Sequence, residues 1–170
     1  GEAPGFTENE LRRPFVGRAG KLLDKMLQEI DWPRGSVYIT NIVKRRPPEN
    51  RDPLPEEIKA YQPYLARQIE IIKPKIIATL GRFAMNYFLP FAKISSAHGQ
   101  VFDADEKLIM PLYHPAAALR ATAVLNDLRA DFKKLPDIVA GKIIVTLPNI
   151  EMKRKKIATP QTKLFWNEHP

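Results

Sequence analysis

The chain has 170 residues, of which 44% are hydrophobic and 27% charged, enough for one globular domain with a core. It has no cysteine, which excludes disulfides, thiolate zinc sites, cysteine nucleophiles and cysteine-ligated iron–sulfur clusters. The net charge of +8 suits a polyanionic partner, with nucleic acid first among the candidates. Because no apolar run reaches the roughly 18 to 20 residues of a membrane helix and no signal segment is visible, we expect a soluble protein that is not secreted.

The first half of the chain predicts two helices and one strand. The glycine- and proline-rich residues 1–16 predict a loop, and residues 17–30 carry apolar side chains at helical spacing. The β-branched and aromatic residues 37–43 predict a buried strand. Three prolines exclude a helix or a central strand from residues 44–53, and residues 55–73 predict a second helix.

The second half continues this alternation. Residues 75–80 and 107–112 predict short buried strands, with a helix directly after the first and a hairpin-like region at 98–105 before the second. Residues 116–135 predict a further helix. The alternation predicts an α/β fold of three layers, α/β/α, around a central, mostly parallel four-stranded sheet. Ligands of such sheets bind at the carboxyl ends of the strands.

The pattern divides the chain into a domain over residues 1–135 and a C-terminal extension over residues 136–170. Within the extension, residues 142–147 favour an edge strand. Residues 152–156 form a basic run of the kind that is usually a solvated surface. The role of the extension is open.

Five short sequence blocks lie on the predicted strand ends or in the loops beyond them. They are residues 1–5 (GEAPG), 13–24 (RPFVGRAGKLLD), 37–44 (VYITNIVK), 46–53 (RPPENRDP) and 113–120 (YHPAAALR). Each block alone is a weak signal, because glycine turns and His-Pro pairs are common. In their order and spacing the five blocks closely resemble the family 4 uracil-DNA glycosylases.

The resemblance implies hydrolysis of the bond between uracil and deoxyribose, which leaves an abasic site in DNA. The implied partner is uracil-containing DNA, single- or double-stranded, bound by a monomer without membrane contact. Together with the absent signal segment, the resemblance also implies a cytoplasmic, prokaryote-like setting. An enzyme that acts on a base must extrude it from the stack and read it by edge hydrogen bonds and aromatic stacking. Because departing uracil leaves negative charge on the base and positive charge on the sugar, a dissociative, oxocarbenium-like path is expected.

Three residues match the uracil pocket of the family. Phe15 matches the stacking aromatic, and Asn41 matches the amide whose donor and acceptor meet uracil O4 and N3–H. His114 matches the donor to uracil O2, which stabilises the transition state more than the ground state. Each has a structural alternative: a core phenylalanine, a strand-ending turn residue and a histidine that fixes its own loop.

Glu2, Glu8 and Asn50 also match positions in the family's site. We expect Glu8 to shape the pocket against the methyl group of thymine, and Glu2 and Asn50 to orient loop backbone or water. Ala3 stands where the family 1 enzymes carry an aspartate that orients the attacking water. The implied chemistry therefore has no dedicated general base, and Glu2 is a candidate for electrostatic support.

The last block implies contacts with the DNA. Leu119 matches the apolar wedge that fills the gap left by the flipped nucleotide, and Arg120 matches a contact to phosphate or the opposite strand. The alternative is an ordinary helix start with Leu119 in the core. Contacts to the DNA backbone are also expected from basic residues near the site, with solvated surface charge as the alternative. These residues are Lys44, Arg45, Arg46 and Arg51.

Family 4 enzymes typically carry a [4Fe–4S] cluster on four cysteines. Arg45 and Tyr61 occupy two of those positions here, so we expect neither this cluster nor another metal or cofactor. Stacking of Arg45 on Tyr61 is the hypothesis for what replaces the cluster. Two further departures are the strand that normally precedes Gly1, which we expect to be truncated, and His98, where the family usually has arginine.

Two other functions stay open at this point. The missing cluster and truncated start favour a DNA- or uracil-binding homologue without catalysis, whereas the retained Phe15, Asn41, Asn50 and His114 favour an active glycosylase. A phosphate- or nucleotide-binding α/β module would need a glycine-rich phosphate loop, which the sequence does not contain.

Overall fold

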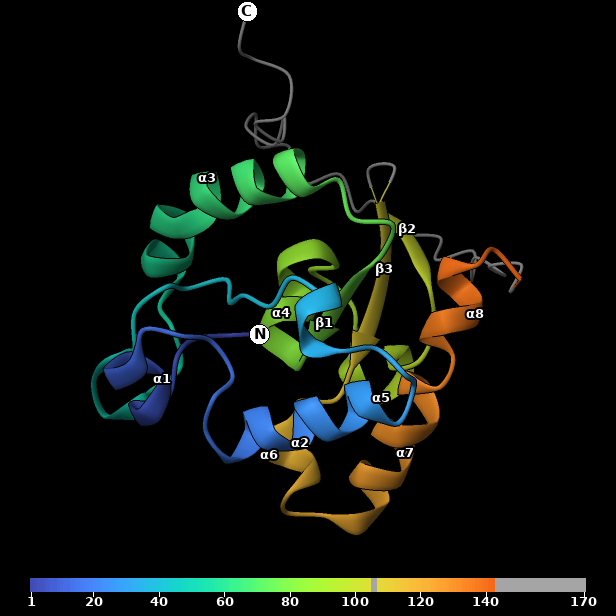
Figure 1. Ribbon diagram of the computed structural model, residues 1–170. Coiled ribbons are helices and arrows are strands. Elements are labelled where there is room, and N and C mark those ends of the chain that lie inside the picture. The colour runs from blue at the N-terminus through green and yellow to red at the C-terminus, as the bar shows by residue number, and fades with distance from the viewer. Residues whose placement is uncertain (105–106, 143–170) are drawn as a thin grey trace, which may run out of the picture.

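A three-stranded sheet lies at the centre of the fold (Figure 1). The computed structural model describes residues 1–104 and 107–142. Strand β1 (Ile77–Leu80) is parallel to β3 (Lys107–Leu112), and β2 (Phe102–Ala104) is antiparallel to β3. The α/β class is confirmed. The expectation of four mostly parallel strands is not met by the described residues, whose strands follow the order β1-β3-β2 with one parallel and one antiparallel pair.

Eight α-helices and two 3-10 turns accompany the sheet in the described residues. Their bounds are α1 (Phe6–Leu11), α2 (Arg18–Gln28), η1 (Arg34–Ser36), η2 (Pro48–Asn50), α3 (Pro55–Ile72), α4 (Arg82–Phe88), α5 (Ile94–Ala97), α6 (Pro115–Ala118), α7 (Thr122–Phe132) and α8 (Leu135–Val139). The helices predicted over residues 17–30 and 55–73 are confirmed as α2 and α3, and the proline-rich loop between them is confirmed. None of these helices is long and apolar enough to cross a membrane.

Helices cover both faces of the sheet. The side chains of Leu108, Met110 and Leu112 on β3 pack in one cluster with α2, α7 and α8. Ile109, between them, packs in a second cluster with α4 and α5. The alternation follows from the two-residue period of a strand. The sheet is therefore the middle layer between two groups of helices (Figure 1).

Residues 1–16, predicted as a loop, contain the helix α1, so this prediction is corrected. None of the α1 residues is buried, so this six-residue helix has no apolar stripe. The glycines and prolines around it predicted a loop. The Glu8 carboxylate on α1 accepts hydrogen bonds from the N–H groups of Val16 and Gly17, at 2.9 and 2.7 Å. Contact with the segment before α2, rather than an amphipathic pattern, stabilises this short helix.

The helix predicted over residues 116–135 is divided into α6, α7 and the start of α8, which is a second correction. The backbone of Ala121 is extended, with φ −147° and ψ 119°, and ends the helical run. Ala118 of α6 and Leu128 of α7 are both buried in the core that α2 shares. The chain turns between them to bring both into that core, and this packing outweighs the helix propensity of the alanine-rich sequence.

Residues 37–43 form no strand, so the predicted strand is wrong. The N–H groups of Ile42 and Val43 donate to the carbonyls of Gly1 and Glu2, at 2.9 Å each. The sheet of the described residues contains only β1, β3 and β2, and this segment lines a hollow of about 670 Å³ together with β1 instead of pairing with it. The β-branched residues therefore lack the ladder partner that a strand requires.

The proposed C-terminal extension begins inside the core. Ile138 of α8 is 6% exposed and packs with α2 and α7. Apart from Lys142, the edge strand predicted over residues 142–147 lies outside the described residues, as does the basic run over 152–156.

Asp131 is a buried carboxylate that connects α7 to the segment before β2. Its side chain is 4% exposed, and its oxygens lie 2.7 Å from His98 Nδ1 and 2.7 Å from Lys134 Nζ. The His98 ring also packs against Tyr113, with ring centroids 4.5 Å apart. His98 therefore contributes to the packing of the domain.

We expect Asp131→Ala to lower the free energy of unfolding by about 2 to 3 kcal/mol, because His98 and Lys134 lose a buried acceptor. Asp127→Ala, on an exposed position of the same helix, is the matched control and is expected to change it by less than about 0.5 kcal/mol. Urea unfolding followed by circular dichroism measures both. Equal losses would show that Asp131 does not stabilise the domain.

Candidate active site

Three residues from distant parts of the sequence meet beyond the carboxyl ends of β1 and β3. The rings of Phe15 and His114 stack, with centroids 5.6 Å apart and 30° between their planes. A Cβ on Gly1 would lie 2.5 Å from Asn41 Oδ1 and 2.5 Å from Phe15 Cζ, so glycine lets the backbone approach both side chains. The structure thus brings together the three residues that were predicted to hold uracil.

Asn41 has a buried acceptor without a partner. The residue is 4% exposed, and its Oδ1 accepts no hydrogen bond in the described part of the chain. Its backbone is fixed, because the ammonium of Lys44 donates to Asn41 O at 2.8 Å. A buried carbonyl oxygen without a donor costs about 1 to 3 kcal/mol, so it is suited to an N–H group supplied by a ligand.

His114 is held as a neutral imidazole. Burial first, and then the amino group of Gly1, lower the pKa of His114 to about 4, although Glu8 opposes the shift. The ring caps α6, and its Nδ1 accepts a hydrogen bond from Ala116 N at 3.0 Å. The neutral ring therefore carries its proton on Nε2. Gly81, at φ 88°, allows the close approach, because a Cβ there would lie 3.1 Å from His114 Cβ.

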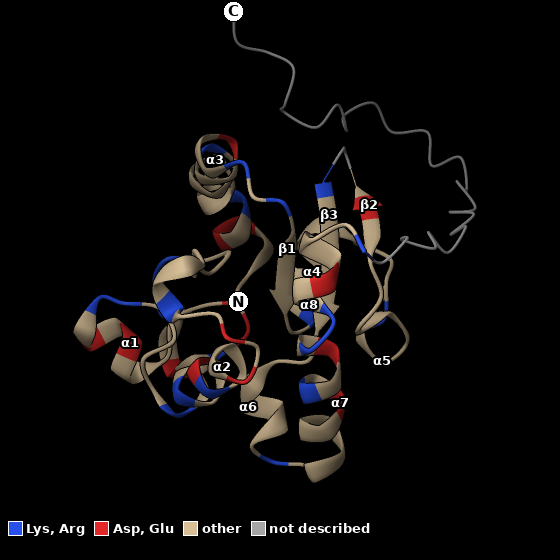
Figure 2. Ribbon diagram, turned by 45° about the vertical axis from the view of Figure 1, so that its right-hand side comes forward, with Lys and Arg blue, Asp and Glu red and all other residues tan. Residues whose placement is uncertain are grey.

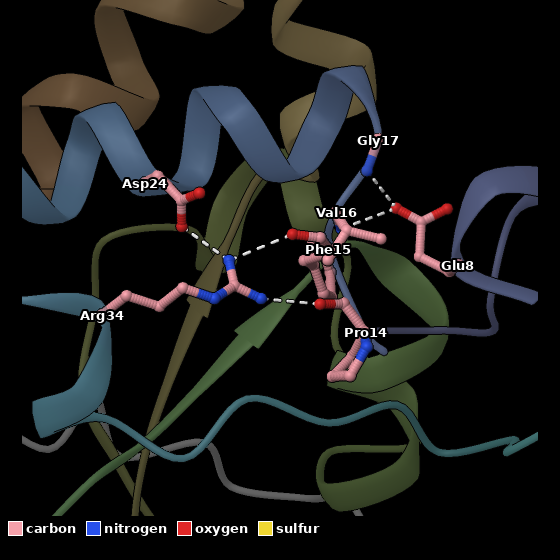
Figure 3. A network of polar contacts seen from close by, with 7 residues as sticks. All are labelled: Glu8, Pro14, Phe15, Val16, Gly17, Asp24 and Arg34. Atoms are coloured by element: carbon pink, nitrogen blue, oxygen red, sulfur yellow. Dashed lines mark hydrogen bonds and ion pairs between the residues drawn. The ribbon is translucent and has the colours of Figure 1, made fainter. Parts of the chain in front are cut away.

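Phe15 lies in a loop that Glu8 holds from one side. The Phe15 backbone is left-handed, with φ 52°, and its side chain is buried. The Glu8 carboxylate accepts the N–H groups of Val16 and Gly17 directly after it (Figure 3). Burial by itself would raise the pKa of Glu8, but the backbone hydrogen bonds, with Gly17 first, lower it overall. Glu8 is therefore a charged acceptor that orders the Phe15 loop.

Glu2 and Ala3 lie on the segment that pairs with Ile42 and Val43. Glu2 is half-buried, and burial first and then the charge of Asp52 raise the pKa of its carboxyl, while Arg82 opposes this. Ala3 packs against the apolar cluster around Ile42. Its methyl group offers no hydrogen-bonding atom to a water molecule.

Asn50 contacts the proline-rich loop rather than the three central residues. It is exposed and left-handed, with φ 54°, and its Oδ1 accepts a hydrogen bond from Arg46 Nε at 2.7 Å. The Arg46 guanidinium also lies over the ring of Phe6 on α1, 5.5 Å from its centroid. Asn50 thus helps connect this loop to α1.

Leu119 and Arg120 lie on the turn between α6 and α7. Leu119 is 44% exposed, which argues against the alternative of a core leucine, and Arg120 is exposed. The break in the predicted helix places both side chains at the surface. An exposed leucine beside an arginine on a sharp turn has the chemistry of a wedge with a phosphate contact.

The basic residues predicted to hold DNA differ in their surroundings. The ammonium of Lys44 turns inward and donates to Thr40 Oγ1, Asn41 O and Gln68 Oε1 within 2.9 Å. Burial lowers the pKa of Lys44 to about 8. These bonds use all three donors of the ammonium, so Lys44 supports Asn41 from within the protein.

Arg51 forms a two-pronged ion pair with Glu57 at the start of α3, with both N–O distances at 2.8 Å. This hydrogen bonding, with Arg51 first, lowers the pKa of Glu57 to about 2. A second hollow, of about 310 Å³, is lined by residues of α1, by the residues directly after it and by residues from the segment 40–45. Its basic lining residues are Arg12, Arg13, Lys44 and Arg45. Figure 2 marks the lysine and arginine positions of the chain in blue.

The residues present do not fit a cysteine-ligated cluster. Arg45 is exposed, and a guanidinium offers donors only. Tyr61 packs with Ile42 and Val43, and its ring lies 6.3 Å from that of Tyr64. The hypothesis of an Arg45–Tyr61 stack is wrong, since the cation–π contacts of the described residues join Arg46 to Phe6 and Arg82 to Phe83. Within residues 1–104 and 107–142, no group of three or more His, Asp or Glu could hold a metal ion.

Arg34 contacts the Phe15 loop, although nothing in the sequence pointed to it as a site residue. Arg34, in η1, donates hydrogen bonds to the carbonyls of Pro14 and Phe15. In the sequence it lies between the helix predicted over residues 17–30 and the strand predicted over residues 37–43. No short motif could reveal this contact, because the acceptors lie about twenty residues earlier and meet Arg34 only through the packing of α2.

Comparison with known proteins shows the family of the chain. The sequence profile of the uracil DNA glycosylase superfamily matches residues 1–135. The chain is 43% identical over 151 residues to the type-4 uracil-DNA glycosylase of Archaeoglobus fulgidus, covering 84% of this chain and 76% of that protein. It is 49% identical over 148 residues to the type-4 enzyme of Sulfurisphaera tokodaii, covering 81% and 67%. With the type-4 enzyme of Thermotoga maritima the identity is 45% over 132 residues, covering 76% and 68%. The chain therefore belongs to the uracil DNA glycosylase superfamily.

The burial of His114 predicts how the protonation of its ring and the stability of the domain depend on pH. We expect the His114 ring to titrate near pH 4 and to carry its proton on Nε2 above that. Between pH 4 and the ordinary value of 6.5 the unfolded chain binds more protons at this site, so stability rises with pH across this window. Nitrogen-15 NMR measures the midpoint, with His114→Gln assigning the signal. A midpoint above 6 would contradict burial as the dominant effect.

Proposed function

We propose that this chain removes uracil from DNA by hydrolysing the bond between uracil N1 and deoxyribose C1′. The observation that carries the proposal is the buried, unpartnered Oδ1 of Asn41 beside the Phe15–His114 stack. Uracil presents a donor at N3 next to an acceptor at O4, and the Asn41 amide offers the complement. Cytosine presents the reverse pattern, so the site rejects the normal base.

The neutral His114 suits the departure of uracil. Its Nε2–H donates to uracil O2, where negative charge grows as the bond breaks, and no proton has to be transferred in that step. The electron pair of the broken bond stays on uracil, and a water oxygen adds to C1′ while one water proton passes to solvent. Glu2 supplies a half-buried carboxylate near the sugar cation, and Ala3 leaves the water without a dedicated base.

The surrounding residues bind and position the DNA. Leu119 fills the gap left by the flipped nucleotide, and Arg120 contacts a phosphate. Phe15 stacks on the base, and Glu8 shapes the pocket by holding the Phe15 loop. The arginines of the proline-rich loop, Arg45, Arg46 and Arg51, attract the DNA backbone. Asn50 helps order the same proline-rich loop through its hydrogen bond with Arg46.

The enzyme works as a cytoplasmic monomer without a metal or other cofactor in this proposal. Contacts between side chains hold the proline-rich loop where the family resemblance implies a cluster. They are the Arg46–Phe6 contact, the Arg51–Glu57 pair and the 2.6 Å Arg82–Asp52 pair.

We expect His114→Ala and Asn41→Ala each to lower the single-turnover rate of uracil excision about a hundredfold or more, because each removes a contact to the reacting base. The substrate is a uracil-containing oligonucleotide, and alkaline treatment reveals the abasic product. Asn126→Ala, an exposed asparagine on α7, is the matched control and should retain the parent rate.

Binding measured on the same oligonucleotide separates the two candidate functions. Tight binding without abasic product in the parent chain would support the non-catalytic DNA-binding homologue instead. Equal rates in the parent and the His114→Ala variant would contradict the assigned site.

We expect Leu119→Ala to lower excision from duplex DNA about tenfold while excision from single strands changes about twofold or less, since only a duplex leaves a gap to fill. Ile71→Ala removes a similarly exposed apolar side chain from α3 and is the control. The ratio of duplex to single-strand rates is the measurement. An unchanged ratio would show that Leu119 is not the wedge.

A further inference from the structure

The backbone of Phe15 must be held in place from outside. Its φ of 52° is in the left-handed region, which an aromatic residue adopts only when the surrounding structure enforces it. In this conformation the Phe15 ring stacks on His114, with the ring centroids 5.6 Å apart. Whatever fixes the Phe15 peptide therefore also fixes the surface that receives a base.

Arg34 makes the contacts that such a role needs. Its Nη1 donates to Phe15 O at 3.0 Å, and its Nη2 donates to Pro14 O at 2.6 Å (Figure 3). Nη1 also bonds Asp24 Oδ1 on α2 at 2.5 Å, which orients the guanidinium. The flat, rigid fork of a guanidinium suits two successive carbonyls, whereas a lysine offers only a point charge on a flexible stem.

Two further contacts complete the enclosure of the loop. Gly20 of α2 packs directly on the Phe15 carbonyl, and a Cβ at this position would overlap that group. On the opposite side, Glu8 accepts the N–H groups of Val16 and Gly17 (Figure 3). The positive charge of Arg34 thus holds the carbonyls of residues 14 and 15, and the negative charge of Glu8 holds the N–H groups of residues 16 and 17.

We propose that Arg34, oriented by Asp24, is a positioning residue for base recognition. It fixes the Pro14 and Phe15 carbonyls and so keeps the Phe15 ring where a flipped uracil stacks. Arg34 acts through Phe15 and contacts neither the base nor the reacting bond. This inference rests on the proposed uracil excision, and it adds to it a requirement at a residue outside the base pocket.

The role predicts a dependence on Phe15 that a merely structural ion pair would not show. Arg34→Met should lower the maximal single-turnover rate on the order of 10- to 100-fold, the loss expected when a recognition group is displaced by about 1 Å. The affinity for uracil-free DNA should not change, because Phe15 meets the base only after flipping. In a Phe15→Ala background, Arg34→Met should cost less than about threefold, since the group it positions is already absent.

The chain offers a matched control for the loss of an ion pair. Arg129 pairs with Glu29, the residue directly after α2, at 2.8 Å, and both side chains are about as exposed as those of Arg34 and Asp24. Arg129→Met should leave the excision rate within about twofold of the parent, as expected for one exposed pair. Arg34→Lys should recover little of the rate, because it cannot reproduce the fork.

The experiment is single-turnover excision of uracil from a single-stranded oligonucleotide by the parent, these variants and the Phe15→Ala double variant. A rate for Arg34→Met within twofold of Arg129→Met, or an equal loss with and without Phe15, overturns the positioning role. If Arg34→Met shows no cooperative unfolding, Asp24→Asn replaces it, with an expected loss on the order of threefold to tenfold that again disappears without Phe15.

The parent chain decides the proposed function separately. If it binds the oligonucleotide but leaves uracil in place, uracil excision is refuted, and the positioning role is then judged by affinity alone. Arg34→Met must in that case reduce the preference for uracil-containing over uracil-free strands. An unchanged preference overturns the role.

Discussion

The site depends on the backbone hydrogen bonds that join the first residues to residues 40–43. Because Ile42 and Val43 donate to the carbonyls of Gly1 and Glu2, the start of the chain lies beside Asn41. The absence of a side chain on Gly1 then lets Phe15 approach the same place. A few main-chain bonds thus assemble a pocket whose members come from three distant parts of the sequence, and the polar chemistry of the site follows from that assembly.

Burial decides how the assembled groups behave. Away from water, the side-chain carbonyl of Asn41 has no partner and the His114 ring stays neutral. Both residues therefore offer uncharged hydrogen-bonding atoms to a base. Lys44, which the net charge alone would place at a DNA surface, turns inward and supports Asn41. Charges such as Arg45 and Arg120 remain on the surface, where they can meet phosphates. In the proposed function, recognition of the base and attraction of the DNA backbone therefore belong to separate groups of residues.

The proline-rich loop shows how the domain is held without thiolate ligands. An arginine over an aromatic ring ties the loop to α1, and ion pairs tie it to α3 and α4. Each exposed pair is weak by itself, because water and salt screen it. The Arg46–Phe6 contact near one end of the loop and the two ion pairs at Arg51 and Asp52 near the other together limit its freedom more than one contact could, and Arg46 also bonds Asn50.

The sequence by itself determined the elements that carry a local pattern and the five blocks that reveal the superfamily. Helices α2 and α3 follow from apolar spacing and proline boundaries, and β3 follows from its buried run. Tertiary structure decided the rest. Residues 37–43 have strand-forming side chains but no ladder partner, and the break at Ala121 follows from packing against α2. The contact of Arg34 with Phe15 also depends on how distant elements pack, because hydrogen bonds between residues twenty positions apart leave no local signal.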